Sequence, residues 1–397
     1  MDRISNPFAP GAGNPPPELA GRSHLLEEAH IALARIKSGK PAQGIILTGL
    51  RGVGKTVLLT EIGHIAQQQG YEAISLEAHE AKPLAELLVP SLRELLYQLS
   101  RIEGAKQLAA RGLRVLRGFL SSITINIEGV TFGLGVEPET GTADSGDLEA
   151  DLPRLFEVIG EAAKAADKPI VLLIDEIQYL QSQEFSALIM ALHRINQRQL
   201  PITMIAAGLP QTLALAGNSK SYAERLFKYP MVGELQKEDA ALALTLPARQ
   251  EGVEFSSEAI DLILETTRRY PYFLQQWGHD TWNAAAASPI RKQDVEVATV
   301  VAISELDQSF FKVRFDRCTP SEKRYMRALA DLGPGTQRSG EVAEKLKVKV
   351  TSLGPVRNGL IRKGMIYSPA HGDTAFTVPL FDEFMMRVMP QIGDNRE

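Results

Sequence analysis

The chain has 397 residues, a net charge of −5, 44% hydrophobic residues and 23% charged residues, which indicates an ordinary globular protein of two or three domains. No apolar stretch approaches the roughly 20 residues needed to span a bilayer, and the N-terminus lacks the apolar segment of a secretory signal. The single cysteine, Cys318, excludes an internal disulfide framework, so we expect a soluble, cytoplasmic protein with no membrane partner.

The first twenty residues are rich in proline and glycine and predict an extended lead rather than a helix. A helix is expected next in "LLEEAHIALARI", with Ser23 as its N-cap. After it, apolar runs alternate with amphipathic segments: expected strands are 44–48, 71–78, 169–175 and 201–208, and expected helices are 55–69, 84–100, 148–166 and 183–198. This order predicts an α/β domain over residues 21–218, with a parallel sheet covered by helices on both faces.

Residues 121–137 break this order, because "SSITINIEGVTFGLGVE" alternates with period two and predicts an inserted β-hairpin. Residues 219–305 have helical spacing and predict a smaller lid domain. The third predicted domain, 306–397, is basic: between Lys312 and Tyr367 thirteen cationic residues stand against five anionic ones, a net charge of +8 that leaves −13 for the rest. Such segregation favours contact with nucleic acid.

The segment "GLRGVGKT" (49–56) lies between an expected strand and an expected helix. Its glycines allow successive backbone N–H groups to face a phosphate, and the following helix directs its positive end there. We expect Lys55 to contact the phosphates of ATP or ADP and Thr56 to bind Mg²⁺. The predicted nucleotide contacts are Gly49, Leu50, Arg51, Gly52, Val53, Gly54, Lys55, Thr56 and Val57.

A second motif, "IVLLIDEIQYL", places Asp175 at the carboxyl end of a buried strand, which is the edge where ligands bind in parallel sheets. We expect Asp175 to hold Mg²⁺ and Glu176 to orient or activate the attacking water. The alternative is an acidic pair that only caps the next helix. The phosphate loop upstream favours the catalytic interpretation.

The phosphate loop, "LLIDEIQYL", the helical lid and the basic C-terminal segment together resemble AAA+ ATPases of the branch that contains origin-recognition and initiator ATPases, and the related signalling NTPases called STAND. The resemblance covers roughly residues 17–390 and implies a P-loop AAA+ core with ATP and Mg²⁺ as cofactors. In this branch, a segment similar to "PPELAGR" (16–22) packs near adenine. A solvated linker is the alternative.

Two further segments are similar to motifs of the same branch. "SYAERLFKYPMVGEL" (221–235) resembles the segment that ends in an arginine finger, so Arg225 is expected to reach the γ-phosphate of a neighbouring subunit in a homo-oligomer, unless it is an ordinary surface residue. "RRYPYFLQQWG" resembles the lid motif whose proline, here Pro271, packs near the base. Relatives usually have glycine where this chain has Arg268 and Arg269, so either is a candidate phosphate sensor, and the aromatic residues belong to the lid core or stack on the base.

The chain departs from the AAA+ pattern at one position. After the strand 201–208 that pattern has a polar sensor residue, which helps to place the attacking water. Here Ala206, Ala207 and Gly208 follow, and Thr203 lies earlier in the strand. The resemblance therefore implies slow hydrolysis, with nucleotide acting mainly as a switch.

Helices are expected at 319–332, 339–348 and 350–366, followed by two short strands around His371 to Asp373. This is the order of a winged helix-turn-helix, the module that origin-recognition ATPases carry at this end, with its third helix directed into a major groove of duplex DNA. Because proline costs about 3 kcal/mol inside a helix, the third helix should begin at Gly354-Pro355. The predicted DNA contacts are Arg357, Asn358 and Arg362 on the groove side, and Lys347, Lys349 and Lys363 on phosphates.

Three functions are compatible with these patterns. The first is an ATPase whose nucleotide state controls DNA binding by the winged helix. The second is a STAND-like switch whose winged helix docks a protein partner. The third is a nucleotide-gated adaptor that does not hydrolyse ATP, which would account for the missing polar sensor.

Overall fold

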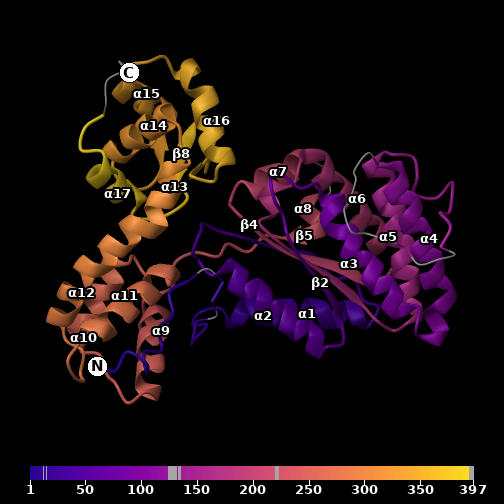
Figure 1. Ribbon diagram of the computed structural model, residues 1–397, viewed down its shortest axis with the longest axis horizontal. Helices are drawn as coiled ribbons and strands as arrows, with labels where there is room; N and C mark the ends of the chain where they lie inside the picture. The colour runs from indigo at the N-terminus through magenta and orange to yellow at the C-terminus, as the bar shows by residue number, and fades with distance from the viewer. Residues whose placement is uncertain (12, 15, 124–131, 133–135, 220–222, 393–397) are drawn as a thin grey trace.

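The computed structural model describes residues 1–392 except 12, 15, 124–131, 133–135 and 220–222. Figure 1 shows a sheet-containing core, a helical region below and to its left, and a C-terminal module above that region. A short helix labelled α13 joins the helical region to the C-terminal module. No helix in the described ranges is long and apolar enough to cross a membrane.

The core holds a five-stranded parallel sheet in the order β2-β3-β4-β1-β5. The strands are β1 (Gly44–Thr48), β2 (Glu72–Glu77), β3 (Ile170–Asp175), β4 (Ile202–Gly208) and β5 (Phe227–Lys228). The three central strands are nearly continuous apolar runs, because side chains on both faces of a parallel sheet are buried under helices. The predicted α/β class and all four predicted strands are confirmed.

Helices cover both faces of this sheet, and alternate strand residues enter two separate apolar cores. On one face lie α1 (Ser23–Lys37) and α2 (Lys55–Gln68), and on the other lie α3 (Leu84–Leu99), α4 (Lys106–Ser122), α5 (Leu148–Ala165) and α6 (Ser182–Gln197). Short 3₁₀ turns, η1 (Glu103–Ala105) and η2 (Ile177–Tyr179), precede α4 and α6.

Two local predictions are corrected. The expected hairpin at 121–137 begins inside α4, since Ser121 and Ser122 are helical, and most of its remaining residues lie outside the described ones. Ser23 is the first helical residue of α1 rather than its N-cap. The cap position is Arg22, whose side chain instead donates hydrogen bonds to the carbonyl oxygens of Val53 and Gly233.

The short helices α7 (Thr212–Ser219) and α8 (Ala223–Leu226) pack on the core. The helical region that follows, the lid, contains α9 (Lys237–Gln250), α10 (Ser257–Thr266), α11 (Pro271–Ala284) and α12 (Lys292–Glu305). The described residues of the N-terminal lead form no helix, and the lead packs against α11. Trp282 Nε1 donates to the Asp2 carbonyl at 2.7 Å, Asn6 Nδ2 donates to the His279 carbonyl at 3.0 Å, and Phe8 is buried. The lead therefore packs on the lid before it enters the core.

A π-helical turn, η3 (Leu306–Phe311), continues α12 and leads into α13 (Lys312–Asp316). The C-terminal module then has α14 (Pro320–Asp331), α15 (Ser339–Leu346), η4 (Val350–Leu353), α16 (Gly354–Arg362) and α17 (Phe381–Val388). Its small antiparallel sheet has the order β6-β8-β7, from β6 (Gln337–Arg338), β7 (Ile366–Tyr367) and β8 (Asp373–Phe376). The structure has the predicted order of three helices and two strands, and α16 begins at Gly354 with proline in its first turn.

Candidate nucleotide-binding site

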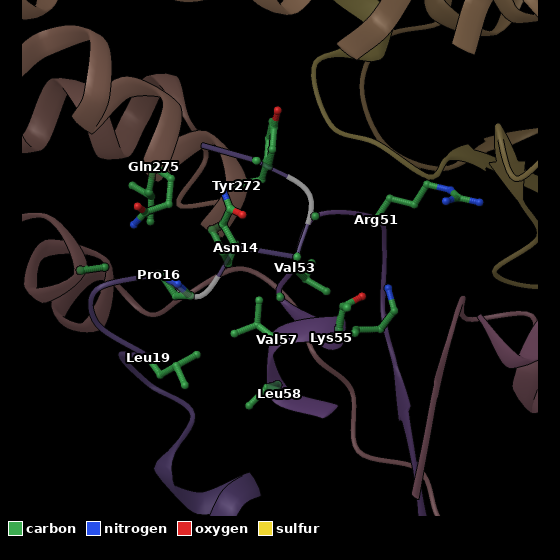
Figure 2. Close-up of a pocket in the computed structure, with 18 of the residues that line it drawn as sticks. Asn14, Pro16, Leu19, Arg51, Val53, Lys55, Val57, Leu58, Tyr272 and Gln275 are labelled. Atoms are coloured by element: carbon green, nitrogen blue, oxygen red, sulfur yellow. The ribbon is translucent and has the colours of Figure 1, made fainter. Parts of the chain in front are cut away.

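A cavity of about 440 Å³ lies at the carboxyl end of the sheet, between the phosphate loop, the N-terminal lead and the lid. Figure 2 shows Asn14, Pro16 and Leu19 of the lead facing the segment that carries Val53 and Lys55. Residues of α11, including the expected Pro271, also line it, together with Glu176, Phe310 and Arg314, so several distant parts of the chain enclose the cavity. The entry segment 16–22 is thus adjacent to the phosphate loop.

The phosphate loop depends on two glycines with positive φ, Gly52 at 83° and Gly54 at 90°. A Cβ atom on Gly52 would lie 3.1 Å from a side-chain atom of Tyr272, so the lid packs directly on the loop. Gly54 is the N-cap of α2 and has no side chain to cap it. The first N–H groups of α2 therefore remain available to a phosphate.

Lys55 is 7% exposed, and its Nζ donates to the carbonyl oxygen of Leu50 at 2.7 Å. Burial lowers the pKa of Lys55 to about 8, although the carboxylates of Glu176 and Asp175 act in the opposite direction. A bound phosphate would add negative charge next to this ammonium group. The cavity therefore presents a cation whose charged form an anion would stabilise.

Thr56 Oγ1 donates to Asp175 Oδ2 at 2.6 Å, which joins the start of α2 to the end of β3. Burial is the main cause that raises the pKa of Asp175, and the hydrogen bond from Thr56 opposes it only in part. Two hard oxygen atoms thus converge beside the phosphate loop. Their chemistry and position fit Mg²⁺, which takes few protein ligands when a nucleotide supplies phosphate oxygens.

Glu176 has a left-handed backbone with φ of 51°, so its side chain leaves the strand end in a different direction from that of Asp175. Its carboxylate accepts hydrogen bonds from Arg51 Nη1 at 3.3 Å and from Gln178 Nε2. Gln178 Oε1 in turn accepts from the backbone N–H of Leu209 at 3.0 Å. The amide of Gln178 thus connects Glu176 to the end of β4.

Gln178 occupies the region where the AAA+ pattern has its polar sensor. A Cβ atom on Gly208 would lie 2.9 Å from Gln178 Oε1 and 2.5 Å from Thr212 Oγ1, so the small residue at this strand end leaves room for both polar groups. The prediction from sequence missed Gln178. The sequence shows that Gln178 lies two residues after Glu176, but the direction of the Gln178 side chain depends on the η2 turn.

Arg51 connects the phosphate loop to the C-terminal module. Its backbone N–H donates to the Thr377 carbonyl at 3.2 Å, and its Nε donates to the Gly364 carbonyl at 3.4 Å. Its Nη2 also donates to Tyr179 Oη at 2.8 Å. The same guanidinium therefore contacts Glu176 and the C-terminal module.

The two lid arginines do not line the nucleotide cavity. Arg268 and Arg269 both have positive φ, Arg268 forms an ion pair with Glu383 of α17 at 2.8 Å, and both line a separate cavity between the lid and the C-terminal module. The structure instead places Arg314, from α13, in the wall of the nucleotide cavity. No motif in the sequence distinguished Arg314 from the other basic residues of its segment.

Arg225 lies far from the cavity of its own chain. It is exposed in α8, and its carbonyl oxygen accepts a hydrogen bond from Gln43 Nε2 at 2.8 Å, at the amino end of β1. The phosphate loop follows the carboxyl end of the same strand. Arg225 therefore does not line the nucleotide cavity of its own chain.

The predicted DNA contacts form two groups. Asn358, Arg362, Lys347 and Lys349 are exposed. In contrast, Arg357 donates to Ser368 Oγ at 2.7 Å, to the Asp373 carbonyl at 2.8 Å and to Thr374 Oγ1 at 3.0 Å. Lys363 forms an ion pair with Glu322 at 2.6 Å. Arg357 and Lys363 thus hold the module together in this structure and are less available to a partner.

Comparison with known proteins supports the core. Residues 18–205 match the family model described as AAA ATPase domain, which confirms the resemblance to AAA+ ATPases, and residues 308–385 match one described only as a domain of unknown function. A curated relative from Methanocaldococcus jannaschii, named an uncharacterized HTH-type transcriptional regulator, is 23% identical over 383 residues. The match covers 94% of this chain and 89% of that protein.

Two solved structures have a similar fold. The Walker-type ATPase of Pyrococcus abyssi matches with a TM-score of 0.57 and 15% identity, covering 92% of this chain and 96% of that one. The ORC2 protein of Aeropyrum pernix, in its ADP form, matches with a TM-score of 0.51 and 13% identity, covering 98% and 99%. At these identities the likeness shows the fold, and it agrees with a P-loop AAA+ core.

The lowered pKa of Lys55 generates a test of nucleotide binding. Phosphate should raise this pKa, so binding above about pH 8 must take up a proton, and affinity should fall by at most about tenfold per pH unit there. Calorimetric titration with ADP at pH 8.5, in buffers of different ionisation enthalpy, measures this uptake. Lys55→Arg is the control because arginine does not titrate in this range, and equal uptake in that variant would contradict the assignment.

Proposed function

We propose that the protein is an ATPase whose nucleotide state sets how a C-terminal winged helix is held against the AAA+ core, and that this winged helix binds duplex DNA. The observation that carries the proposal is the direct contact between the phosphate loop and the C-terminal module through Arg51. A ligand that changes the loop acts on a residue that also touches Gly364 and Thr377. Nucleotide and module orientation are then coupled through a physical contact.

In the proposed reaction, the N–H groups of the loop and Lys55 bind the phosphates of ATP, and Thr56 and Asp175 hold Mg²⁺, which supplies charge neutralisation when bound. Glu176 accepts the proton of the attacking water, and Gln178 positions the Glu176 carboxylate against β4. In this structure Arg51 also holds that carboxylate. A carboxylate held by Arg51 and Gln178 is less free to approach a water, which supports slow turnover while the module is docked.

We propose that the exposed residues Asn358 and Arg362 of α16, with Lys347 and Lys349, face DNA. The module contacts the phosphate loop at Gly364 and Thr377, and these four residues remain exposed in this docked arrangement. The name of the relative from Methanocaldococcus jannaschii supports an HTH-type regulator. The competing function, docking of a protein partner, is favoured by the internal use of Arg357 and Lys363.

We also propose that Arg225 completes the site of a neighbouring subunit, so that hydrolysis requires a homo-oligomer. Its exposure and its place at the amino end of β1 support this arrangement.

The proposed base is tested by Glu176→Gln. Loss of the proton acceptor should reduce ATP turnover by about 10²- to 10⁴-fold while nucleotide affinity stays near that of the parent. The matched control is Glu77→Gln. Glu77 of β2 lies beside Asp175 in the register of the parallel strands β2 and β3, but it does not line the cavity. Steady-state phosphate release and nucleotide titration are the measurements, and normal turnover in the Glu176 variant would refute its role.

DNA binding is tested by titrating fluorescent duplex DNA at two salt concentrations. Changing both Lys347 and Lys349 to Gln should weaken binding and reduce the dependence of log affinity on log salt by about two units. The control changes Lys40 and Lys106, two exposed lysines of the core, and should leave both quantities unchanged. Absence of binding by the parent at low salt would favour the protein-docking function instead.

The oligomer is tested by Arg225→Ala. Turnover per subunit of the parent should rise with protein concentration, and the variant should lose this rise and about 10³-fold in maximal rate, with nucleotide affinity retained. Sedimentation with ATP reports assembly in parallel. A variant with parental turnover at every concentration would leave Arg225 as an ordinary surface residue.

A further inference from the structure

Arg314 belongs to α13, the short helix between the lid and the C-terminal module, yet it lines the nucleotide cavity together with Lys55 and Glu176. A stack of rings holds it there. Its guanidinium lies over the ring of Phe310, with 4.0 Å from Cζ to the ring centroid, and Phe310 stacks on Tyr272 at 4.7 Å between centroids. The lid therefore fixes the direction in which Arg314 points.

The charge of Arg314 lacks a counter-ion. Among the described residues it forms no ion pair, and its one side-chain hydrogen bond is the donation from Nη1 to the Phe310 carbonyl at 2.6 Å. Arg51, the next cation, is paired with Glu176 at 3.3 Å. Burial, followed by the neighbouring charge of Arg51, lowers the pKa of Arg314 to about 10. A half-buried guanidinium with most of its five N–H donors free of protein partners, in the wall of this cavity, is well suited to an anionic ligand.

We propose that Arg314 binds the terminal phosphate of a nucleoside triphosphate and so reports the difference between ATP and ADP to the C-terminal module. This inference rests on the proposed function, because it deepens the role of the same site. As the proposed base, Glu176 would lie near the terminal phosphate, and it is among the charged groups near Arg314. The bidentate geometry of arginine suits phosphate oxygens.

The position of α13 explains how this contact would reach the module. The carbonyl of Arg317, at the end of α13, accepts a hydrogen bond from Lys363 Nζ at 2.9 Å, and Lys363 also pairs with Glu322 of α14. A displacement of Arg314 would therefore move Lys363, at the end of α16, and Glu322, in the first turn of α14. Arg314, rather than Arg268 or Arg269, is therefore a second cation, besides Arg51, that would link nucleotide and module.

The experiment measures the affinities of the non-hydrolysable analogue AMP-PNP and of ADP, each with Mg²⁺, by calorimetric titration of the full chain. Arg314→Gln should weaken AMP-PNP by about 10- to 100-fold and ADP by less than about threefold, because only the triphosphate loses a charged hydrogen bond. Arg314→Lys keeps the charge and should recover part of the loss. Arg317→Gln is the matched control, since Arg317 lines an adjacent cavity with Arg314 but not the nucleotide cavity.

An unchanged ratio of the two affinities in Arg314→Gln, with both nucleotides lost in Lys55→Ala, would overturn this inference and leave the proposed function intact. Equal binding by the parent and Lys55→Ala would instead overturn the proposed function. If Arg314→Gln does not fold, as judged by circular dichroism, a parental ratio in Arg314→Lys and in Arg314→Met overturns the inference. The inference is also overturned if Arg314→Gln weakens duplex DNA binding measured in the absence of nucleotide but keeps the parental ratio of AMP-PNP and ADP affinities. Arg314 would then bind a DNA phosphate.

Discussion

The backbone of two adjacent residues in the phosphate loop holds the three regions of this protein together. The carbonyl of Arg51 accepts a hydrogen bond from Tyr270 Oη, and the carbonyl of Gly52 accepts one from the N–H of Tyr272, both in the lid. The N–H of Arg51 donates to Thr377 of the C-terminal module. Because each buried backbone group needs a partner, a shift of the loop must be matched by shifts in both regions.

The side chain of Arg51 adds a second constraint. One guanidinium serves the carboxylate of Glu176, the hydroxyl of Tyr179 and the carbonyl of Gly364. These contacts use three different nitrogens of one rigid planar group, Nη1, Nη2 and Nε, so a movement of the module that turns the guanidinium also changes its contact with Glu176. The base proposed for hydrolysis and the docking of the module are therefore linked by chemistry at a single residue, without a long pathway.

The sequence predicted the parts of the site that lie in contiguous segments: the phosphate loop, with Lys55, and the strand end at Asp175 carry patterns that few other structures produce. It could not predict residues that reach the cavity through tertiary contacts. Arg314 points inward because Phe310 packs on Tyr272. No helix was expected over α4, although its apolar residues recur at helical spacing; its Gly112 leaves room for Leu96 of α3.

The N-terminal lead gives the cavity an unusual wall. Its first residues are attached to α11 through Trp282 and Phe8, while Asn14 and Pro16 line the cavity opposite Lys55. This wall is thus anchored to the lid and not to the sheet. A rotation of the lid would carry the lead with it and open the cavity on two sides at once. Release of a nucleotide from the proposed site would then depend on the rate of lid rotation.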